Sequence, residues 1–422
     1  MHSLVRFWLL SAAIVVRIGL FGESLSLSAP RGLSYDTILK LAQNRYQSNE
    51  NVTSSPMKGM VAVITGAAGG IGGELSKVVH RLGGTVVALD RNSTGLEVLQ
   101  KSLIQERSDG NVVNDKTDSK GCQTPSESAK DRVVILPTNH EDLASVKKSS
   151  EIIISKFGRI DLLVNNAGLS YTNNRSMVSA HGRDLAFTVN YLSHFLLTEL
   201  LLKRLSNGGR IVHVTSTFHW MVDGSELLPN GENGVPMAYQ SNPQFQSPKH
   251  VERSYANTKL AQIWHSRSIA KAHKGARCSS VCACPTWAST GIAGEGARSF
   301  LDKYAFAVSD CGPGVTSAIN AMLRTDEELG DALDEGRSFV ANSKILDYIS
   351  IVVRGLLTSK FVSKIRGCRD FLAGILSAVL LVGQKYTYRD FILQETSPES
   401  FEDEGKRDKF YKWSKEEVKT WL

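Results

Sequence analysis

The segment Val61–Asp90 constrains the fold of this chain more than any other stretch, because it joins two strand patterns through a glycine-rich turn and a helical pattern. Val61–Thr65 is short, uncharged and mostly β-branched, as expected for a strand buried on both faces of a parallel sheet. Glu74–Leu82 carries apolar side chains at helical spacing, and Thr85–Leu89 is a second buried strand that ends at Asp90. This order predicts a βαβ unit, from which doubly wound α/β folds are built.

The glycine-rich turn between the first strand and the helix is suited to bind a phosphate group. Glycines permit backbone angles that other residues resist, and the free N–H groups at a helix N-terminus attract negative charge. Asp90 stands where a carboxylate accepts hydrogen bonds from ribose hydroxyls. A plain flexible turn is the alternative, but it does not explain the order of strand, turn, helix, strand and acid. The unit therefore predicts dinucleotide binding, with turn contacts from Thr65, Gly66, Gly70, Ile71 and Gly72.

The alternation of strands and helices continues after this unit. Val133–Leu136 and Ile160–Val164 are predicted strands, and Leu143–Phe157 between them is a predicted helix. Residues 108–130 are polar and interrupted by glycine and proline, so we expect a disordered surface loop there. The pattern predicts one α/β domain with a doubly wound parallel sheet over residues 58–422.

The later predicted elements carry polar side chains that suit acid–base chemistry. Leu185–Leu202 is a long apolar helix, Arg210–Thr215 is a strand, and Tyr255–Ala270 is a helix whose first tyrosine and lysine share one face at i, i+4 spacing. A tyrosine–lysine pair alone is frequent by chance, and an ordinary half-exposed helix pair is its simplest explanation. The polar residues on or directly after these elements are Asn190, Ser216, Tyr255 and Lys259.

The glycine turn and a second motif together resemble the short-chain dehydrogenase/reductase family. The motifs are Thr65-Gly66-x-x-x-Gly70-Ile71-Gly72 and Asn165-Asn166-Ala167-Gly168. The resemblance implies a Rossmann-type fold, NAD or NADP as cofactor, and hydride transfer between the nicotinamide and an alcohol or carbonyl. It also implies that Asn190, Ser216, Tyr255 and Lys259 form the catalytic tetrad, since they occur in the family's order and spacing.

The expected roles of these four residues follow from carbonyl reduction. A group must deliver a proton to the substrate oxygen while another stabilises its developing charge, which suits Tyr255 and Ser216 respectively. A free tyrosine has a pKa of about 10, so the ammonium of Lys259 is expected to favour the phenolate by Coulomb attraction. By the resemblance, Lys259 also binds the nicotinamide ribose, and Asn190 holds a water that passes the proton outwards.

The resemblance adds further cofactor contacts. It leaves open the choice between NAD and NADP and whether the protein is catalytically active. Asp90 repels a 2′-phosphate whereas Arg91 attracts one, so NAD is slightly favoured and NADP is the alternative. Thr286 replaces the glycine that relatives carry after the proline, which keeps open a catalytically silent, dinucleotide-sensing or interaction protein on the same fold. Beyond the turn, the expected cofactor contacts are Asp90, Arg91, Asn139, Asn166, Ala167, Gly168, Tyr255, Lys259, Pro285 and Thr290.

Within the family, several segments resemble the retinol-dehydrogenase-like branch. They are Val189–Phe195, Thr215–Trp220, Tyr255–Ala261 and the closing Lys409–Ser414. The branch implies a lipophilic small-molecule substrate such as a retinoid, a steroid or a fatty aldehyde.

Charge and cysteine content limit other functions. The net charge of +7 is modest for 422 residues, and no stretch interleaves basic and aromatic residues as a nucleic-acid surface does. Cys278, Cys282 and Cys284 lie on or beside the predicted strand Ser279–Cys284 and lack a Cys-x-x-Cys pair, so we expect buried core thiols and no metal. A homo-oligomer is compatible with the sequence.

Two segments favour membrane association. Met1–Gly22 pairs a basic start with an apolar run that Arg17 interrupts, as in a signal peptide or a membrane anchor. Residues 23–57 are serine-rich, and we expect a leader or linker without a fold of its own. The insertion 344–383 mixes apolar and basic residues, as an amphipathic helical element at a membrane surface does, although an extra packed helical pair is an equal alternative. The expected location is the endoplasmic reticulum and secretory pathway, or an organelle reached through it.

Overall fold

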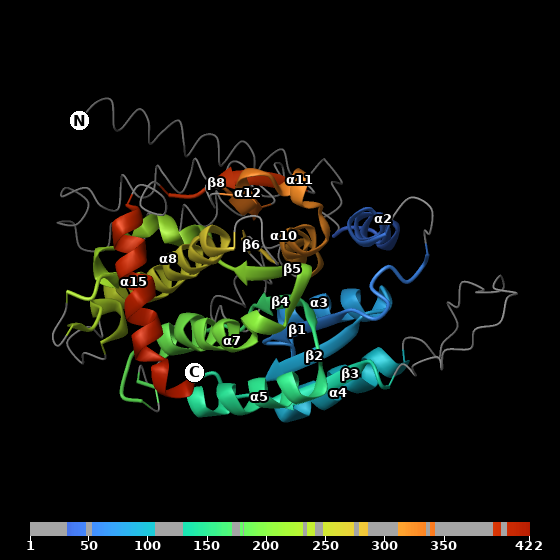
Figure 1. Ribbon diagram of the computed structural model, residues 1–422, viewed down its shortest axis with the longest axis horizontal. Coiled ribbons are helices and arrows are strands. Elements are labelled where there is room, and N and C mark those ends of the chain that lie inside the picture. Colours follow the sequence, from blue (N-terminus) through green and yellow to red (C-terminus); the bar gives the residue numbers. More distant parts are fainter. Residues whose placement is uncertain are drawn as a thin grey trace, which may run out of the picture.

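The computed structural model describes residues 32–47, 53–105, 130–170, 178–179, 181–230, 234–240, 248–273, 278–285, 311–334, 338–341, 391–397 and 403–422. These form an eight-stranded sheet in the order β3-β2-β1-β4-β5-β6-β7-β8, in which only β8 runs antiparallel to its neighbour among the described strands (Figure 1). The parallel strands and crossover helices confirm the predicted doubly wound α/β fold. The strands are β1 (Val61–Thr65), β2 (Thr85–Asp90), β3 (Val133–Pro137), β4 (Ile160–Asn165), β5 (Leu205–Val214), β6 (Cys278–Ala283), β7 (Ser338–Ala341) and β8 (Ile392–Glu395).

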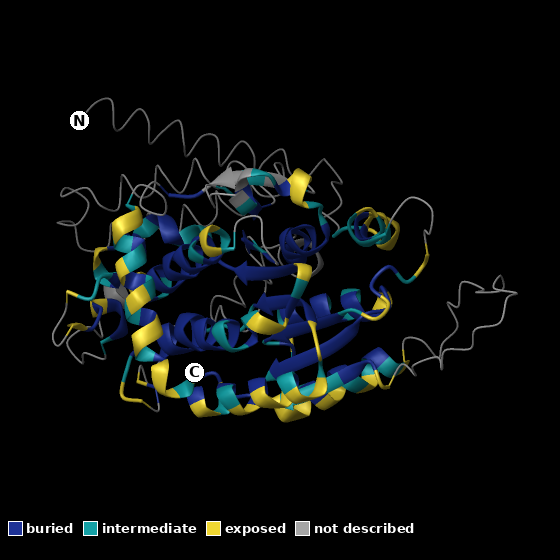
Figure 2. Ribbon diagram, viewed as in Figure 1, coloured by how far each residue is buried: buried dark blue, intermediate teal, exposed yellow. Residues whose placement is uncertain are grey.

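Two hydrophobic clusters cover the two faces of this sheet. Along β1, Ala62 and Ile64 belong to one cluster whereas Val61 and Val63 belong to the other, because successive strand residues point to opposite faces. Figure 2 shows the strands as a buried layer, with exposed residues on the outer sides of the helices. The first cluster includes α2 (Tyr35–Tyr46), α3 (Gly70–Arg81), α4 (Ser93–Gln105) and α10 (Cys311–Leu323), and the second includes α5 (Leu143–Lys156), α7 (Ser193–Leu201), α8 (Pro248–Ala272) and α15 (Glu404–Glu417).

Helix α2 was not predicted, since residues 23–57 were expected to have no fold of their own. The Ser34 hydroxyl caps the helix by accepting from the Thr37 amide at 3.2 Å. The buried residues Ile38 and Leu41 face the first cluster. Short helices are marginal alone, so packing on α10 stabilises one whose own sequence pattern is weak.

The predicted helix Leu185–Leu202 is divided into several turns. It consists of α6 (Leu185–Phe187), the π-helical η1 (Thr188–Leu192) and α7, and a 3-10 turn, η2 (Leu202–Arg204), follows. Leu185–Arg204 is also, within the described residues, the one helix that is long and apolar enough to cross a membrane, but 83% of its apolar window is buried inside the fold. Core helices have the same composition, and this one lies between α5 and α8 over the sheet.

The remaining described elements are the C-terminal helix and several short helical turns. The C-terminal α15, expected from Lys409–Ser414, packs on α8, and its Ser414 hydroxyl lies 2.7 Å from the Tyr191 hydroxyl. The short elements are η3 (Thr217–Met221), η4 (Ser225–Leu227), η6 (Met237–Tyr239), α11 (Asp326–Leu329), α12 (Asp331–Asp334) and η11 (Lys419–Trp421). The N-terminal segment 1–22, nearly all of the predicted loop 108–130 and the insertion 344–383 lie outside the described residues.

Candidate active site

The glycine-rich turn has the backbone geometry that only glycine readily adopts. Gly66 and Gly70 have φ angles of 67° and 54°. Gly72 is required for a different reason, because a Cβ there would lie 2.2 Å from the Gly66 carbonyl oxygen and 2.8 Å from Asn166 Nδ2. The turn is therefore folded tightly against the end of β4.

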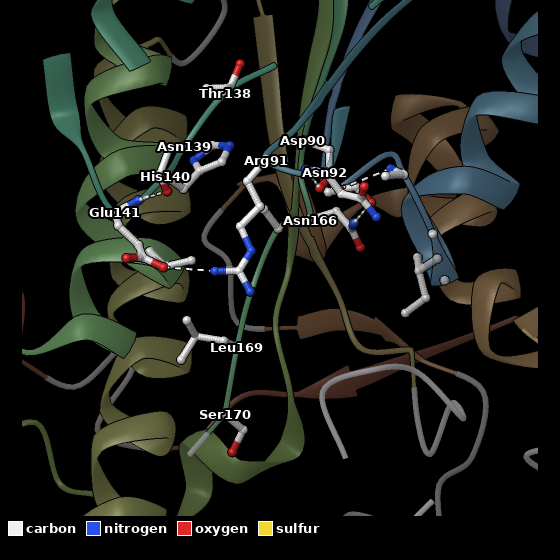
Figure 3. A pocket seen from close by; sticks show the side chains of 18 residues that line it. Asp90, Arg91, Asn92, Thr138, Asn139, His140, Glu141, Asn166, Leu169 and Ser170 are labelled. Atoms are coloured by element: carbon white, nitrogen blue, oxygen red, sulfur yellow. Dashed lines mark hydrogen bonds and ion pairs between the residues drawn. The ribbon is translucent and has the colours of Figure 1, made fainter. Parts of the chain in front are cut away.

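The first turn of α3 opens onto a cleft at the carboxyl ends of the strands (Figure 3). Gly69 caps this helix without a side-chain hydrogen bond, which leaves the N-terminal amides available to a ligand. The cleft has a volume of about 430 Å³ and is lined by Gly66, Ala68, Gly69, Gly70 and Ile71 from the turn. The close backbone approach and uncapped amides fit the diphosphate of a dinucleotide.

Asp90 lies at the end of β2 and lines this cleft. Its two carboxylate oxygens accept hydrogen bonds from the backbone amides of Ala68 at 3.1 Å and Asn92 at 2.9 Å. Each oxygen keeps a second lone pair, so the carboxylate remains able to accept from ribose hydroxyls. Asp90 thus both holds the glycine turn and faces the expected ribose.

Arg91 extends from β2 towards the segment after β3 (Figure 3). Its guanidinium forms an ion pair with Glu141 at 2.9 Å, and 58% of the Arg91 side chain is exposed. Glu141, Asn92 and His140 also line the cleft, and sequence analysis did not single them out. Their position directly after β2 or shortly after β3 was the available signal, since ligands of doubly wound sheets bind at strand carboxyl ends.

Thr65 and Gly72, two of the predicted contact residues, support the cleft without lining it. Thr65 is fully buried, and its hydroxyl accepts from the backbone amides of Asn166 and Ala167, both at 2.9 Å. Asn166, Ala167 and Gly168 line the cleft, whereas Thr65 is absent from its lining. Asn139 also lines it, while its side-chain oxygen accepts from the Glu141 amide at 3.1 Å. Gly72 supports the turn without lining the cleft.

Asn190 lies in the π-helical turn η1 and is fully buried. Its side-chain oxygen accepts from the Leu169 amide at 2.8 Å, and its Nδ2 donates to the Leu169 carbonyl at 2.9 Å and to the Thr258 hydroxyl at 3.1 Å. Leu169 lines the cleft and Thr258 lies on α8. The side chain of Asn190 therefore joins the cleft to the helix that carries Tyr255 and Lys259. π-Helical turns are frequent at functional sites.

Ser216 and Tyr255 lie together at the carboxyl end of β5. The Ser216 hydroxyl lies close enough to the Tyr255 phenol to affect its pKa, and the Ser216 oxygen accepts from the Phe218 amide at 3.3 Å. Burial raises the pKa of Tyr255 above its ordinary value of 10.0, and the neighbouring Ser216 hydroxyl acts in the opposite direction. The expected lowering of this pKa by Lys259 is not seen in this arrangement.

Lys259 follows one turn after Tyr255 and is 3% exposed. Its ammonium donates to the Val214 carbonyl at 2.9 Å and to Gln262 Oε1 at 3.1 Å, and lies 5.3 Å from the centre of the Tyr255 ring. Burial lowers the pKa of Lys259 to about 8. Two of its three N–H groups thus donate to groups other than the phenol.

The structure brings the four predicted tetrad residues to one edge of the sheet. Pro285 follows β6 at the same edge and is half-buried, whereas Thr286 and Thr290 lie outside the described residues. Cys278 and Cys282 lie on β6 and Cys284 directly follows it; all three are buried free thiols, as predicted. Gln262 was missed because one glutamine in a helix gives no distinctive sequence pattern.

A model of a known protein family matches a segment that contains some of the site residues. The family model described as short chain dehydrogenase matches residues 109–223. The match includes Asn166, Asn190 and Ser216, whereas the glycine turn, Tyr255 and Lys259 lie outside it.

Several curated proteins are similar to the chain over roughly two fifths to one half of its length. They include the chloroplastic short-chain dehydrogenase TIC 32 A of Brassica napus, 25% identical over 53% of this chain and 61% of that protein. Retinol dehydrogenase 12 of Homo sapiens is 27% identical over 53% of this chain and 60% of its own length. D-threitol dehydrogenase of Mycolicibacterium smegmatis is 28% identical over 38% and 54% respectively. The chain therefore spans about three fifths or less of these relatives.

Among solved structures, an uncharacterised protein from Mycobacterium paratuberculosis has the same fold. The TM-score is 0.53 at 18% identity, over 86% of this chain and 94% of that one.

Proposed function

We propose that the chain is a member of the short-chain dehydrogenase/reductase family and an NAD(P)-dependent oxidoreductase acting on an alcohol/carbonyl pair, which its similarity to the family model and to several dehydrogenases supports. The observation that carries this proposal is that Ser216, Tyr255 and Lys259 lie together at the edge of the sheet where the glycine-rich cleft opens. Lys259, one helical turn away, supplies the only ammonium that the described structure places over the Tyr255 ring.

These residues suit proton transfer to an oxygen. A bound nicotinamide supplies or accepts the hydride. Tyr255 donates a proton to the substrate oxygen in reduction, and its raised pKa keeps the phenol protonated for that step. Ser216 stabilises the developing charge on the same oxygen by a hydrogen bond. In oxidation the proton moves in the opposite direction, and the third N–H of Lys259 is free to stabilise the phenolate.

The preferred cofactor under this proposal is NAD(H). Asp90 lines the cleft with lone pairs for ribose hydroxyls and repels a 2′-phosphate. Arg91 is the residue that would favour NADP(H), but its charge is partly neutralised by Glu141. Gly70 adds no basic side chain. NADP(H) remains the alternative cofactor.

A lipophilic substrate such as a retinoid, a steroid or a fatty aldehyde is the second part of the proposal. The segments Val189–Phe195, Thr215–Trp220 and Tyr255–Ala261 support the retinol-dehydrogenase-like branch, as does the similarity to retinol dehydrogenase 12. Comparable identity to a chloroplastic dehydrogenase and a D-threitol dehydrogenase shows why the substrate must be tested directly.

Membrane association in the secretory pathway, or in an organelle reached through it, completes the proposal. Its support is the sequence of Met1–Gly22 and of residues 344–383. An amphipathic membrane-surface segment would give a lipophilic substrate a short path into the enzyme.

The decisive experiment follows nicotinamide absorbance with the purified full-length protein. All-trans-retinal, a 3-ketosteroid and decanal are offered with NADH or NADPH, and glyceraldehyde serves as the hydrophilic control. We expect turnover of at least one lipophilic compound and little of glyceraldehyde. Tight nucleotide binding without any turnover would instead identify a catalytically silent, dinucleotide-sensing protein.

A further inference from the structure

We propose that Gln262 is a positioning residue of the active site, whose side-chain amide joins the Asn190 main-chain carbonyl to the Lys259 amine. The proposal rests on the proposed function and extends it to a residue outside the tetrad. Gln262 lies on α8, less than one turn after Lys259, and is 1% exposed. Its Nε2 lies 2.9 Å from the Asn190 oxygen and its Oε1 lies 3.1 Å from the Lys259 nitrogen.

The orientation of this amide is fixed by its neighbours. A lysine ammonium can only donate, so the atom of Gln262 that faces Lys259 must be the oxygen. The Gln262 nitrogen then donates to Asn190, whose carbonyl can only accept. The flipped amide would place a donor against a donor and an acceptor against an acceptor.

The same logic fixes the next residue in the chain of hydrogen bonds. His194 Nδ1 lies 3.0 Å from the Asn190 carbonyl oxygen, so Nδ1 carries the proton. Its unprotonated Nε2 lies 2.9 Å from the Thr65 hydroxyl, which also lies 3.3 Å from the Val164 carbonyl oxygen and accepts from two backbone amides. Burial, the largest cause, and the nearby His140 and Lys259 lower the pKa of His194, in agreement with a neutral ring.

This arrangement links Asn190 to Lys259. The Asn190 main-chain carbonyl accepts from Gln262 Nε2 and from His194 Nδ1. The Gln262 amide stands between this carbonyl and the Lys259 amine, so it holds the amine in a fixed position relative to the helical turn that carries Asn190.

Other groups also face the Lys259 ammonium. Beside Tyr255 on α8, they are His194 on α7, His213 on β5, and Cys282 and Cys284 on or after β6. Burial lowers the pKa of His213 to about 3 and raises the pKa of Cys282 to about 12, so both are neutral at physiological pH. Gln262 is thus the side chain that satisfies this ammonium by a hydrogen bond in the described structure.

The experiment compares Gln262→Leu and Gln262→Glu in the full-length protein. Gln262→Leu removes both hydrogen bonds at similar volume, and we expect kcat to fall about tenfold or more while the Kd of NADH stays within about twofold. The limb of the pH–kcat profile that reports Lys259 should move to lower pH in Gln262→Leu, because the charged amine loses an acceptor. It should move to higher pH in Gln262→Glu, because a carboxylate favours the ammonium. Equal profiles in all three proteins would overturn the proposal.

A second measurement does not depend on turnover. In a double-mutant cycle, Gln262→Leu and Lys259→Met are combined and urea unfolding is followed for each protein. We expect the two losses of stability to be non-additive, whereas losses that add within error would show that Gln262 does not act on Lys259. Gln100→Leu is the matched control, since Gln100 is a half-buried glutamine that donates to the Val133 carbonyl at 3.2 Å away from the site. Absence of turnover in the wild-type protein would refute the proposed function, and the cycle would still decide the contact.

Discussion

Asn166 Nδ2 donates to the Thr65 carbonyl oxygen at 2.9 Å and so ties the end of β4 to the start of the glycine-rich turn. The same Nδ2 also lies 3.4 Å from the Gly66 carbonyl oxygen. The two strands are neighbours in the sheet, so this contact fixes the turn relative to the sheet before any ligand binds. A turn held in this way keeps its free amides aimed at the cleft, which lowers the entropy cost of binding a diphosphate.

Gly72→Ala should damage this arrangement. The new Cβ would lie 2.2 Å from the Gly66 oxygen and 2.8 Å from Asn166 Nδ2, both in the packed base of the turn. We expect a stability loss of about 1–3 kcal/mol, typical of overpacking, with weaker NADH binding. Gly158→Ala is the matched control, because its Cβ would meet no atom within 4 Å and Gly158 does not line the cleft. Urea unfolding and NADH titration measure both effects, and equal losses in the two variants would contradict the explanation.

Tyr255→Phe should remove turnover while the fold and the cofactor cleft remain. The phenol is the proposed proton donor, and loss of a general acid lowers kcat by about 10²–10⁴-fold. Tyr255 does not line the cofactor cleft in the described structure, so the Kd of NADH should change little. Tyr46→Phe, which removes a hydroxyl bonded to the Met322 carbonyl at 3.4 Å, is the control and should retain full activity. Retained turnover in Tyr255→Phe would remove this residue from the mechanism.

Acid should destabilise the protein through its buried histidines. Burial lowers the pKa of His140 from 6.5 to about 4. Between about pH 6.5 and pH 4, His140 is therefore protonated in the unfolded chain but neutral in the folded protein. Stability from this residue is fully present above pH 6.5 and falls by roughly 1.4 kcal/mol per pH unit between these values.

Substitution of His140 tests this explanation. His140→Asn should flatten the loss of unfolding free energy between pH 6.5 and 4, since the residue no longer titrates. Ser193→Ala removes the hydroxyl that lies 2.9 Å from His140 Nδ1 but keeps the imidazole, so it should cost stability without flattening the slope. Urea unfolding at several pH values distinguishes the two variants, and an unchanged slope in His140→Asn would assign the acid sensitivity to other groups.

The sheet could be predicted from sequence because its strands are buried on both faces. Val61–Thr65 is an uncharged apolar run, and Ile160–Val164 is apolar except for Asp161. Short apolar runs between helical patterns predict buried strands. Helix α2 was missed because its stability comes from packing on α10 and not from its own pattern. The π-helical turn at Asn190 was missed for a related reason. Its sequence has ordinary helical character, and the side-chain bonds to Leu169 and Thr258 that accompany the irregular turn are long-range.

The same distinction separates the site residues that could be predicted from sequence from those that could not. Asp90 and Tyr255 follow from motif order, since chemistry requires a particular side chain at a particular strand or helix end. Glu141 and Gln262 act through contacts with Arg91 and Lys259, and such partners cannot be read from spacing along the chain.

Glu141 should influence cofactor choice through Arg91. The ion pair at 2.9 Å competes with a 2′-phosphate for the guanidinium. Glu141→Gln releases Arg91 and should raise the affinity for NADPH relative to NADH by about twofold to fivefold, the range of an exposed ion pair. Asp142→Asn makes the same charge change one residue further without an ion pair to Arg91, and should leave the ratio unchanged. Titrations of both nucleotides at fixed salt provide the ratio.

The last prediction concerns the proposed membrane association through two separable segments. Met1–Gly22 supplies apolar length, and residues 344–383 supply apolar area beside basic charge, worth about 1 kcal/mol per Lys or Arg near an anionic surface. Without Met1–Gly22 the protein should keep weak binding to anionic vesicles. This binding should weaken with salt, because charge attraction is screened over roughly 8 Å at physiological ionic strength.

Sedimentation with vesicles of phosphatidylserine and phosphatidylcholine measures this binding. Replacing Lys360, Lys364, Arg366 and Arg369 with glutamine in the truncated protein should abolish it, since the apolar residues alone give little attraction to a charged surface. Vesicles of phosphatidylcholine alone are the control and should bind neither protein. Basic residues bind an anionic membrane surface most strongly at low salt. If the truncated protein does not bind anionic vesicles even at low salt, residues 344–383 are an internal packing element.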